Sequence, residues 1–274
     1  MNRRTFFKLG LAAAASVVPA GTLYAMHSTA LEITRHQVAL PGLDRRMRIV
    51  IISDLHGRPR YLPVQELIET ANRLRPDILI LAGDMIDRPG DLDVLPAFAG
   101  AEAKLLKAAV LGNWEHKTGL GVETFKSAYA AAGIHLLLNS TFNIQNLALF
   151  GLDDLVHGRP DFKNLEAACT GNRPCLLITH CPAAFDHLPS AAAAPVLAVS
   201  GHTHGGQIAP FGNAIVTPPG SGDYVHGWYR RGTASMYVTR GIGTSGVPIR
   251  IGARPEMVVV EVEGGVAQGT GGRA

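Results

Sequence analysis

Seven polar residues of metal-ligand type occur in five short motifs along the chain. The motifs are Asp-x-His, Gly-Asp, Gly-Asn, a His that follows Leu-Leu-Ile-Thr, and Gly-His-x-His-Gly-Gly. Taken singly, each is equally readable as a helix cap, a turn or a polar strand end. Taken together, they offer carboxylate, amide and imidazole ligands, a mixture that suits Mn, Fe or Zn better than Ca or Mg. The candidate metal ligands are Asp54, His56, Asp84, Asn113, His180, His202 and His204.

Each motif follows a short apolar segment that is typical of a buried strand. The predicted strands are residues 31–39, 47–52, 78–82, 107–111, 134–138, 141–145, 147–151, 175–179, 196–200 and 257–262. The predicted helices are residues 63–74, 93–106, 122–132 and 162–169. This alternation indicates an α/β fold with largely parallel strands, and the later hairpins and the last strand suggest a second sheet. Ligands bind beyond the carboxyl ends of such strands, where all five motifs lie.

In their order along the chain, the five motifs resemble the signature blocks of the calcineurin-like metallophosphoesterase superfamily. The resemblance covers about residues 31–262, and residues 205–208, 237–243 and 248–250 are similar to its exported bacterial phosphodiesterase branch, of the YkuE and YaeI type. It implies a four-layer α/β/β/α sandwich of two mixed sheets, with the metal site at the carboxyl ends of the strands.

The resemblance also implies how the ligands divide between two divalent cations. One cation would be held by Asp54, His56 and His204, the other by Asn113, His180 and His202, and Asp84 would bridge them. A carboxylate suits the bridging position because two cations about 3.5–4 Å apart repel each other. The implied reaction is metal-assisted hydrolysis of a phosphate ester. The ligands do not select among Mn, Fe and Zn, because metal availability decides that choice.

One position departs from the superfamily pattern. The third motif usually continues Gly-Asn-His, and that His is expected to protonate the leaving group, but this chain has Trp114 there. His116 is the predicted substitute if the loop is extended, and a loop histidine without a catalytic part is the alternative. Loss of a general acid slows a reaction roughly 10²–10⁴-fold. The substitution therefore favours a diester or diphosphate with a good leaving group over an alkyl monoester.

Three further polar residues each have a functional and a structural interpretation. Arg240 lies in a glycine-rich segment and could contact a phosphate, or it could be a structural arginine. Asp87 could orient a ligand imidazole or cap a turn, and Arg58 could face the substrate or the solvent.

The first 28 residues are predicted to be a twin-arginine-type signal peptide. Arg3 and Arg4 precede Phe6, Phe7 and Lys8, and an apolar run over residues 9–19 follows. That run is shorter than a spanning helix, although an uncleaved anchor is the alternative. The metallophosphoesterase domain is expected over residues 29–264, followed by a disordered tail over 265–274. The expected location is the periplasm or the outer face of the inner membrane, with the twin-arginine export machinery as a partner.

The composition argues against nucleic-acid binding and against a disulfide framework. The formal charge of +3 comes from Arg3, Arg4 and Lys8, since the other basic residues number 22, as do the acidic ones. A body near neutrality has no basic surface for nucleic acid, so none is expected as a partner. The three cysteines do not form a disulfide framework, although Cys169 and Cys175 could pair or remain free thiols.

The function that these features favour is two-metal-dependent hydrolysis of a phosphodiester or pyrophosphate bond in an envelope-associated substrate, of which a lipid-linked phosphate ester is one candidate. One alternative is an enzyme of the lipid A pathway that resembles UDP-2,3-diacylglucosamine pyrophosphatase, although that substrate is cytoplasmic. A non-catalytic metal-binding homologue and a protein phosphatase are the others.

Overall fold

The computed structural model describes residues 29–59, 61–170, 173–188 and 194–265. The predicted signal peptide and nearly all of the predicted tail lie outside the described residues. No helix among the described residues has both the length and the apolar character needed to cross a membrane.

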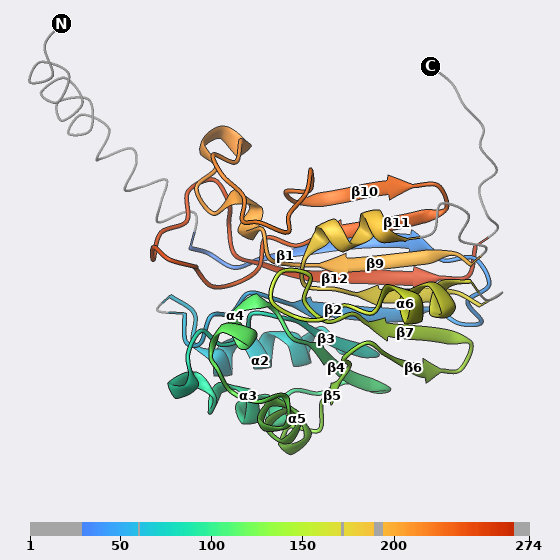
Figure 1. Ribbon diagram of the computed structural model, residues 1–274, viewed down its shortest axis with the longest axis horizontal. Helices are drawn as coiled ribbons and strands as arrows, with labels where there is room; N and C mark the ends of the chain where they lie inside the picture. Colours follow the sequence, from blue (N-terminus) through green and yellow to red (C-terminus); the bar gives the residue numbers. More distant parts are fainter. Residues whose placement is uncertain (1–28, 60, 171–172, 189–193, 266–274) are drawn as a thin grey trace, which may run out of the picture.

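The first sheet has six strands in the order β1-β12-β2-β3-β4-β5 (Figure 1). Its strands are β1 (Glu32–Ala39), β2 (Met47–Ile52), β3 (Ile78–Ala82), β4 (Leu106–Val110), β5 (His135–Leu136) and β12 (Glu256–Glu263). The neighbours β2, β3, β4 and β5 run parallel, so their carboxyl ends share one edge. β12 is antiparallel to β2 and parallel to β1, so β1 begins at that same edge.

The second sheet also has six strands, in the order β10-β11-β9-β8-β7-β6. Its strands are β6 (Ser140–Ile144), β7 (Leu147–Gly151), β8 (Cys175–Ile178), β9 (Val196–Ser200), β10 (Gly227–Arg231) and β11 (Ala234–Val238). The middle strands β7, β8, β9 and β11 are parallel, and an antiparallel strand closes each edge.

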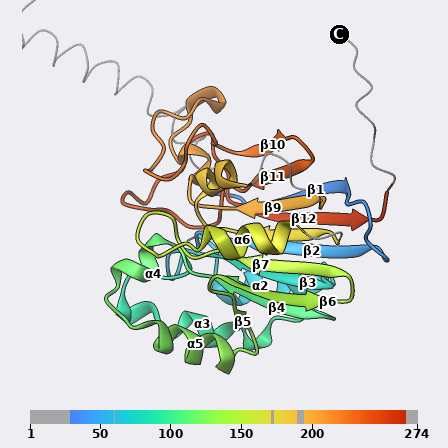
Figure 2. The ribbon, with the colours of Figure 1, turned by 45° about the vertical axis from the view of Figure 1, so that its right-hand side comes forward.

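Three apolar layers hold the sheets and helices together (Figures 1 and 2). Between the two sheets, Ile51 and Ile80 of the first pack with Leu176 of the second. The outer face of the first sheet is covered by α2 (Val64–Arg73), α3 (Val94–Ala97) and α5 (Val122–Ala131). The outer face of the second is covered by α6 (Phe162–Cys169) and a 3-10 helix at Pro182–His187. The predicted four-layer α/β/β/α sandwich of two mixed sheets is confirmed.

Several predicted elements differ from the structure. The helix predicted over residues 93–106 is wrong, because α3 spans only Val94–Ala97 and a 3-10 turn ends at Gly100. Gly100 is a poor helix former, and Ala101 is already extended. The last strand, β12, belongs to the first sheet rather than the second. The β10–β11 hairpin and the short helix α4 (Asn113–Lys117) were not predicted.

Candidate metal centre

All five motifs meet at the shared carboxyl edge of the two sheets. Asp54 and His56 follow β2, Asp84 follows β3, and Asn113 begins α4 just after β4. His180 follows β8, and His202 and His204 follow β9. The potential ligand atoms form two groups, each within 4.8 Å, one of Asp54, His56 and His204 and the other of Asp84, His180 and His202. The structure therefore brings together residues that are up to 150 positions apart in the sequence.

The backbone at the ligands is unusual. Asp54, His56, Asp84, His202 and His204 all have positive φ, between 53° and 75°. A non-glycine residue in this region costs of order 1–3 kcal/mol and clusters at functional sites. The left-handed turns send His202 and His204 to different groups, which is the division that the superfamily resemblance implies.

Glycine permits the close approach of the ligand loops. A Cβ on Gly112 would lie 2.3 Å from Oδ1 of Asp84 and 2.5 Å from its backbone nitrogen. Gly83 has φ +86°, and a Cβ there would lie 2.6 Å from Nδ1 of His180. The glycines of the Gly-Asp and Gly-Asn motifs are thus required by the packing of the loops against one another.

The imidazole lone pairs of the site face one another. Nδ1 of His180 bonds to the carbonyl oxygen of Ala82 at 2.9 Å, and Nε2 of His202 bonds to that of Pro219 at 2.8 Å. Each of these nitrogens donates to a carbonyl oxygen, so in the neutral ring the other nitrogen carries the lone pair. Those lone-pair atoms, Nε2 of His180 and Nδ1 of His202, are only 3.2 Å apart. The carbonyl oxygens of Ala82 and Pro219 thus hold the two rings in the way that is expected for metal-bound histidines.

The side-chain amide of Asn113 lies against this group. One of its terminal atoms is 2.9 Å from Nδ1 of His202 and 3.3 Å from Oδ2 of Asp84, and the other is 3.0 Å from Nζ of Lys117. With its nitrogen towards the site the amide donates to His202 and Asp84, and with its oxygen towards the site it offers a cation a further ligand. The residues fit the implied metal because the buried carboxylates and imidazoles place their potential ligand atoms within 4.8 Å of one another in each group.

The second group repeats this arrangement. Asp87 accepts a hydrogen bond from Nδ1 of His56, as predicted for an orienting carboxylate, and leaves Nε2 of His56 facing Nε2 of His204 at 2.9 Å. Oδ2 of Asp84 lies 3.1 Å from Nε2 of His180 and 3.9 Å from Nε2 of His56. Asp84 thus stands between the two groups, where a bridging ligand would lie.

The pKa shifts of the site separate a charged Asp84–His180 pair from two neutral imidazoles. Burial favours the neutral form of Asp84, but the His180 imidazole outweighs it and holds the pKa of Asp84 well below its ordinary range. Burial alone would lower the pKa of His180, yet Asp84 raises it well above the usual value, so a cation bound at Nε2 would displace a proton from this ring. Burial and neighbouring imidazoles lower the pKa values of His202 and His204. These two rings are therefore neutral, as metal ligands must be.

Two buried charged residues support the ligand loops and were not singled out from the sequence. Glu115 is fully buried and accepts backbone hydrogen bonds from Asp84 and Gly112, both at 2.9 Å. Arg250 is also buried and donates to the carbonyl oxygens of Gly243 and His204. Glu115 stands two residues after the predicted ligand Asn113, so its place beside the third motif was a signal. Arg250 lies in a matched segment but had no predicted role.

The two residues predicted to act on the substrate point elsewhere. Asn113–Lys117 is helical, so the extended loop assumed for His116 was wrong. Nε2 of His116 lies 2.7 Å from Oδ1 of Asp153. The Arg240 guanidinium pairs with Glu32 at 2.9 Å and with Glu256 at 3.4 Å. The roles of His116 as proton donor and of Arg240 as phosphate contact stay predictions that these contacts do not support.

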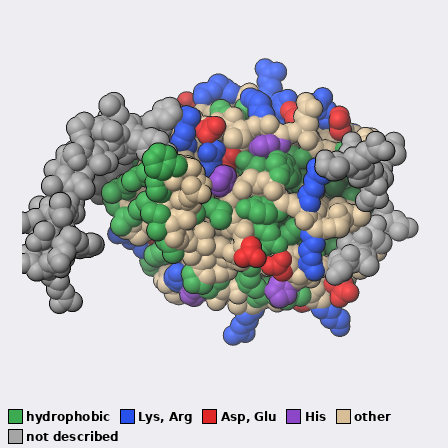
Figure 3. All heavy atoms as spheres, turned by 90° about the horizontal axis from the view of Figure 1, so that it is seen from above, with side chains coloured by type: hydrophobic (Ala, Val, Ile, Leu, Met, Phe, Trp, Pro, Cys, Tyr) green, Lys and Arg blue, Asp and Glu red, His purple; other side chains and the backbone are tan. Residues whose placement is uncertain are grey.

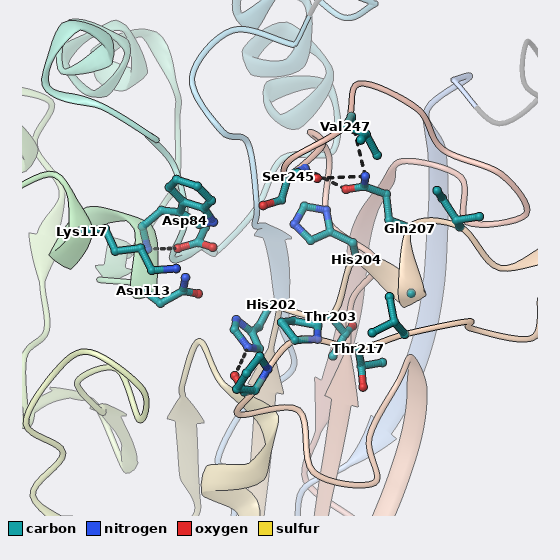
Figure 4. Close-up of a pocket in the computed structure, with 16 residues that line it drawn as sticks. Asp84, Asn113, Lys117, His202, Thr203, His204, Gln207, Thr217, Ser245 and Val247 are labelled. Carbon is teal, nitrogen blue, oxygen red and sulfur yellow. Dashed lines mark hydrogen bonds between the residues drawn. The ribbon is translucent and has the colours of Figure 1, made fainter.

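A pocket of about 430 Å³ opens directly onto the ligands. In Figure 4, Asp84, Asn113 and Lys117 lie on one side of it and His204 on the other. Trp114 also lines the pocket, and Nζ of Lys117 lies 4.7 Å from its ring centroid. The remaining wall is largely apolar and includes Val216, Ile208, Pro218, Pro219 and Val247. The pocket thus combines a cation-binding floor with one lysine and an apolar side.

Comparisons with known proteins agree with this geometry. A family model described as Calcineurin-like phosphoesterase matches residues 47–206. The chain is 33% identical over 281 residues to the uncharacterized metallophosphoesterase YkuE of Bacillus subtilis, covering 94% of this chain and 96% of that protein. It is 28% identical to an uncharacterized metallophosphoesterase of Campylobacter jejuni, over 95% of this chain and 71% of that protein. It is also 29% identical to a protein of Danio rerio named as a transmembrane protein with metallophosphoesterase domain. That match covers 80% of this chain and 53% of the Danio rerio protein.

Proposed function

We propose that this chain, which belongs to the calcineurin-like phosphoesterase family and is a metal-dependent phosphoesterase, hydrolyses a phosphodiester or pyrophosphate bond in an envelope-associated substrate. The observation that carries the catalytic part is the gathering of buried carboxylate and imidazole ligand atoms into two groups, each within 4.8 Å, with Asp84 between them. Two divalent cations held there would activate water as a nucleophile and polarise the phosphoryl oxygens. The cations are Mn, Fe or Zn by ligand type.

The side chains around the ligands account for the rest of the chemistry. Asp87 and the carbonyl oxygens of Ala82 and Pro219 fix the imidazole rings, so their lone pairs need no reorientation during the reaction. Lys117 lines the pocket as a cation that can contact a phosphate oxygen. Trp114 lines it too and has no titratable proton to give. A leaving group that departs without strong acid assistance, as in a diester of an acidic alcohol or a diphosphate, suits this site.

An envelope substrate is supported by the N-terminal sequence and by the pocket. The paired arginines and the apolar run over residues 9–19 favour export through the twin-arginine route. A relative from Danio rerio is named as a transmembrane protein. The apolar wall formed by Val216 and Val247 suits a substrate with a lipid portion.

The test is turnover by the metal-reconstituted full chain on bis-p-nitrophenyl phosphate, p-nitrophenyl phosphate and a lipid diphosphate. We expect Mn-dependent hydrolysis with the monoester as the poorest substrate, and near-complete loss in Asp84→Asn. Asp44→Asn is the matched control, because Asp44 is exposed and distant from the site in the fold. If none of the three substrates is turned over in a metal-dependent way, the catalytic function is contradicted and the chain is a non-catalytic metal-binding homologue. A preference for the monoester would contradict the diester assignment.

A further inference from the structure

The mouth of the pocket is bordered by a strongly exposed group of apolar side chains. Among the described residues, five of the eight large hydrophobic side chains that are exposed lie in two neighbouring loops. We call these five the apolar rim, with exposed fractions of 96% for Phe211, 70% for Ile215, 72% for Val216, 48% for Val247 and 47% for Ile249. A cluster of this kind beside a polar cleft marks an interaction site.

The two loops are tied together as one platform. The side-chain nitrogen of Gln207 donates to the carbonyl oxygens of Ser245 at 3.1 Å and Val247 at 2.9 Å, and its side-chain oxygen accepts from the backbone nitrogen of Ser245 at 2.7 Å. Ile208 and Ile251 form a β-bridge behind them. The exposure of the rim is therefore built into the fold rather than the result of a loose segment.

The rim is continuous with the site and carries no charge. Val216 and Val247 belong both to the rim and to the wall of the pocket. Residues 207–217 and 241–249 contain no Asp, Glu, Lys or Arg. Figure 3 shows apolar side chains gathered at the end of the molecule that carries these loops in Figure 1. An uncharged, protruding border is suited to the apolar part of a lipid layer.

The position of β1, where the fold begins, favours a lipid bilayer over another protein as the partner of the apolar rim. Glu32, at the start of β1, pairs with Glu256, and Nη2 of Arg240 contacts Glu32 at 2.9 Å. The backbone nitrogen of Glu256 in turn bonds to the carbonyl oxygen of Gly241, which adjoins Asp54. The chain therefore enters the fold at the ligand-bearing edge. In the uncleaved chain, the apolar run over residues 9–19 ends 13 positions earlier, a reach of at most about 45 Å.

We infer that the apolar rim docks on a bilayer surface and turns the pocket towards a phosphate group carried by a membrane lipid. The inference rests on the proposed function for its substrate but uses a different surface. Phe211 and Ile215 do not line the pocket, so they would enter the interfacial region of the bilayer while Val216 and Val247 border both the lipid and the site.

The experiment uses the full chain with vesicles of phosphatidylethanolamine and phosphatidylglycerol. The double variant Phe211→Asn/Ile215→Thr removes apolar area, and Asn tolerates the positive φ of 57° at position 211. Phe211→Leu/Ile215→Val is the matched control, because it keeps the rim apolar. We expect the first variant to partition onto vesicles at least about tenfold more weakly and the control to bind like the wild type. Both should hydrolyse soluble bis-p-nitrophenyl phosphate at the wild-type rate.

A second measurement reports on the rim even if residues 1–28 also bind lipid. In F211W, the added fluorescence should be quenched by vesicles that contain dibrominated phosphatidylcholine, to a greater extent than that of the two natural tryptophans. No extra quenching would overturn the docking inference while leaving the proposed function intact. A change from dimer to monomer in the polar variant, with vesicle binding unaltered, would overturn it in favour of a second copy. Vesicle binding without any turnover would instead count against the proposed function alone.

Discussion

Gly112→Ala is expected to damage the metal centre by displacing Asp84. The added Cβ would lie 2.3 Å from Oδ1 of Asp84 and 2.5 Å from its backbone nitrogen, and real Cβ contacts are essentially never shorter than 3.0 Å. Either the carboxylate or the loop after β3 must therefore move by roughly 0.5–0.7 Å, a small overpacking that costs about 1–3 kcal/mol. Gly112 itself has φ −103°, which any residue can adopt, so the effect is one of space and not of backbone strain.

The consequence for activity follows from the size of the shift. A misplacement of about 1 Å can cost roughly 10²-fold in rate, so a somewhat smaller shift should lower kcat by roughly 10–10²-fold. The assay is Mn-loaded turnover of bis-p-nitrophenyl phosphate at saturation, together with urea unfolding. Gly90→Ala is the matched control, because a Cβ on Gly90 would have no neighbour within 4 Å.

Two outcomes would refute this reasoning. Turnover in Gly112→Ala within about twofold of the Gly90→Ala control would show that Asp84 need not lie where the structure places it. A loss of stability with full activity would separate the packing at Gly112 from the metal centre. If Gly112→Ala does not fold, Asp84→Asn tests the carboxylate directly, because it keeps the size of the side chain and removes its charge.

Three further predictions concern residues around the ligands. His116→Ala should slow alkyl diesters by roughly 10²–10⁴-fold and p-nitrophenyl diesters much less if His116 is the proton donor; an unchanged leaving-group profile would exclude that role. Lys117→Gln should raise the KM for bis-p-nitrophenyl phosphate about tenfold, because a hydrogen bond to a charged group contributes ~1.5 kcal/mol, and an unchanged KM would contradict the contact. Burial favours the neutral acid of Glu256, but Arg240 holds its pKa below the ordinary value. Its stabilising contribution is therefore complete above about pH 4.5 and lost at lower pH. The urea unfolding free energy should fall less on acidification in Glu256→Gln than in the wild type, and parallel curves would argue against the shift.

The sequence was most informative where apolar strands end in polar residues. Short buried strands such as β3 are unbroken apolar runs, and the residue after such a run has to lie at the sheet edge. Because each of them follows such a strand, Asp84 and His180 were predicted to lie close together, although they are 96 positions apart in the sequence. The fold class followed from the same alternation of strands and helices.

What the sequence could not predict depends on short elements and on contacts between distant loops. α4 spans only five residues, too few for a helical periodicity to emerge, so His116 was assigned to the wrong kind of backbone. Arg240 lies in a glycine-rich segment, as a phosphate-binding residue often does, but its partners Glu32 and Glu256 come from strands at opposite ends of the chain. The buried position of Glu115 was likewise unexpected, because the partners that allow it, the backbone nitrogens of Asp84 and Met85, belong to a loop about 30 positions earlier.

The central claim is that one chain holds two divalent cations bridged by Asp84, and electron paramagnetic resonance of the Mn-loaded protein tests it most directly. Two Mn²⁺ ions about 3.5–4 Å apart with a shared carboxylate should be exchange-coupled. We therefore predict a spin-coupled dinuclear spectrum when two equivalents are bound, and its loss in Asp84→Asn. A spectrum of isolated Mn²⁺ ions at two equivalents, or saturation at one ion per chain, would contradict the account.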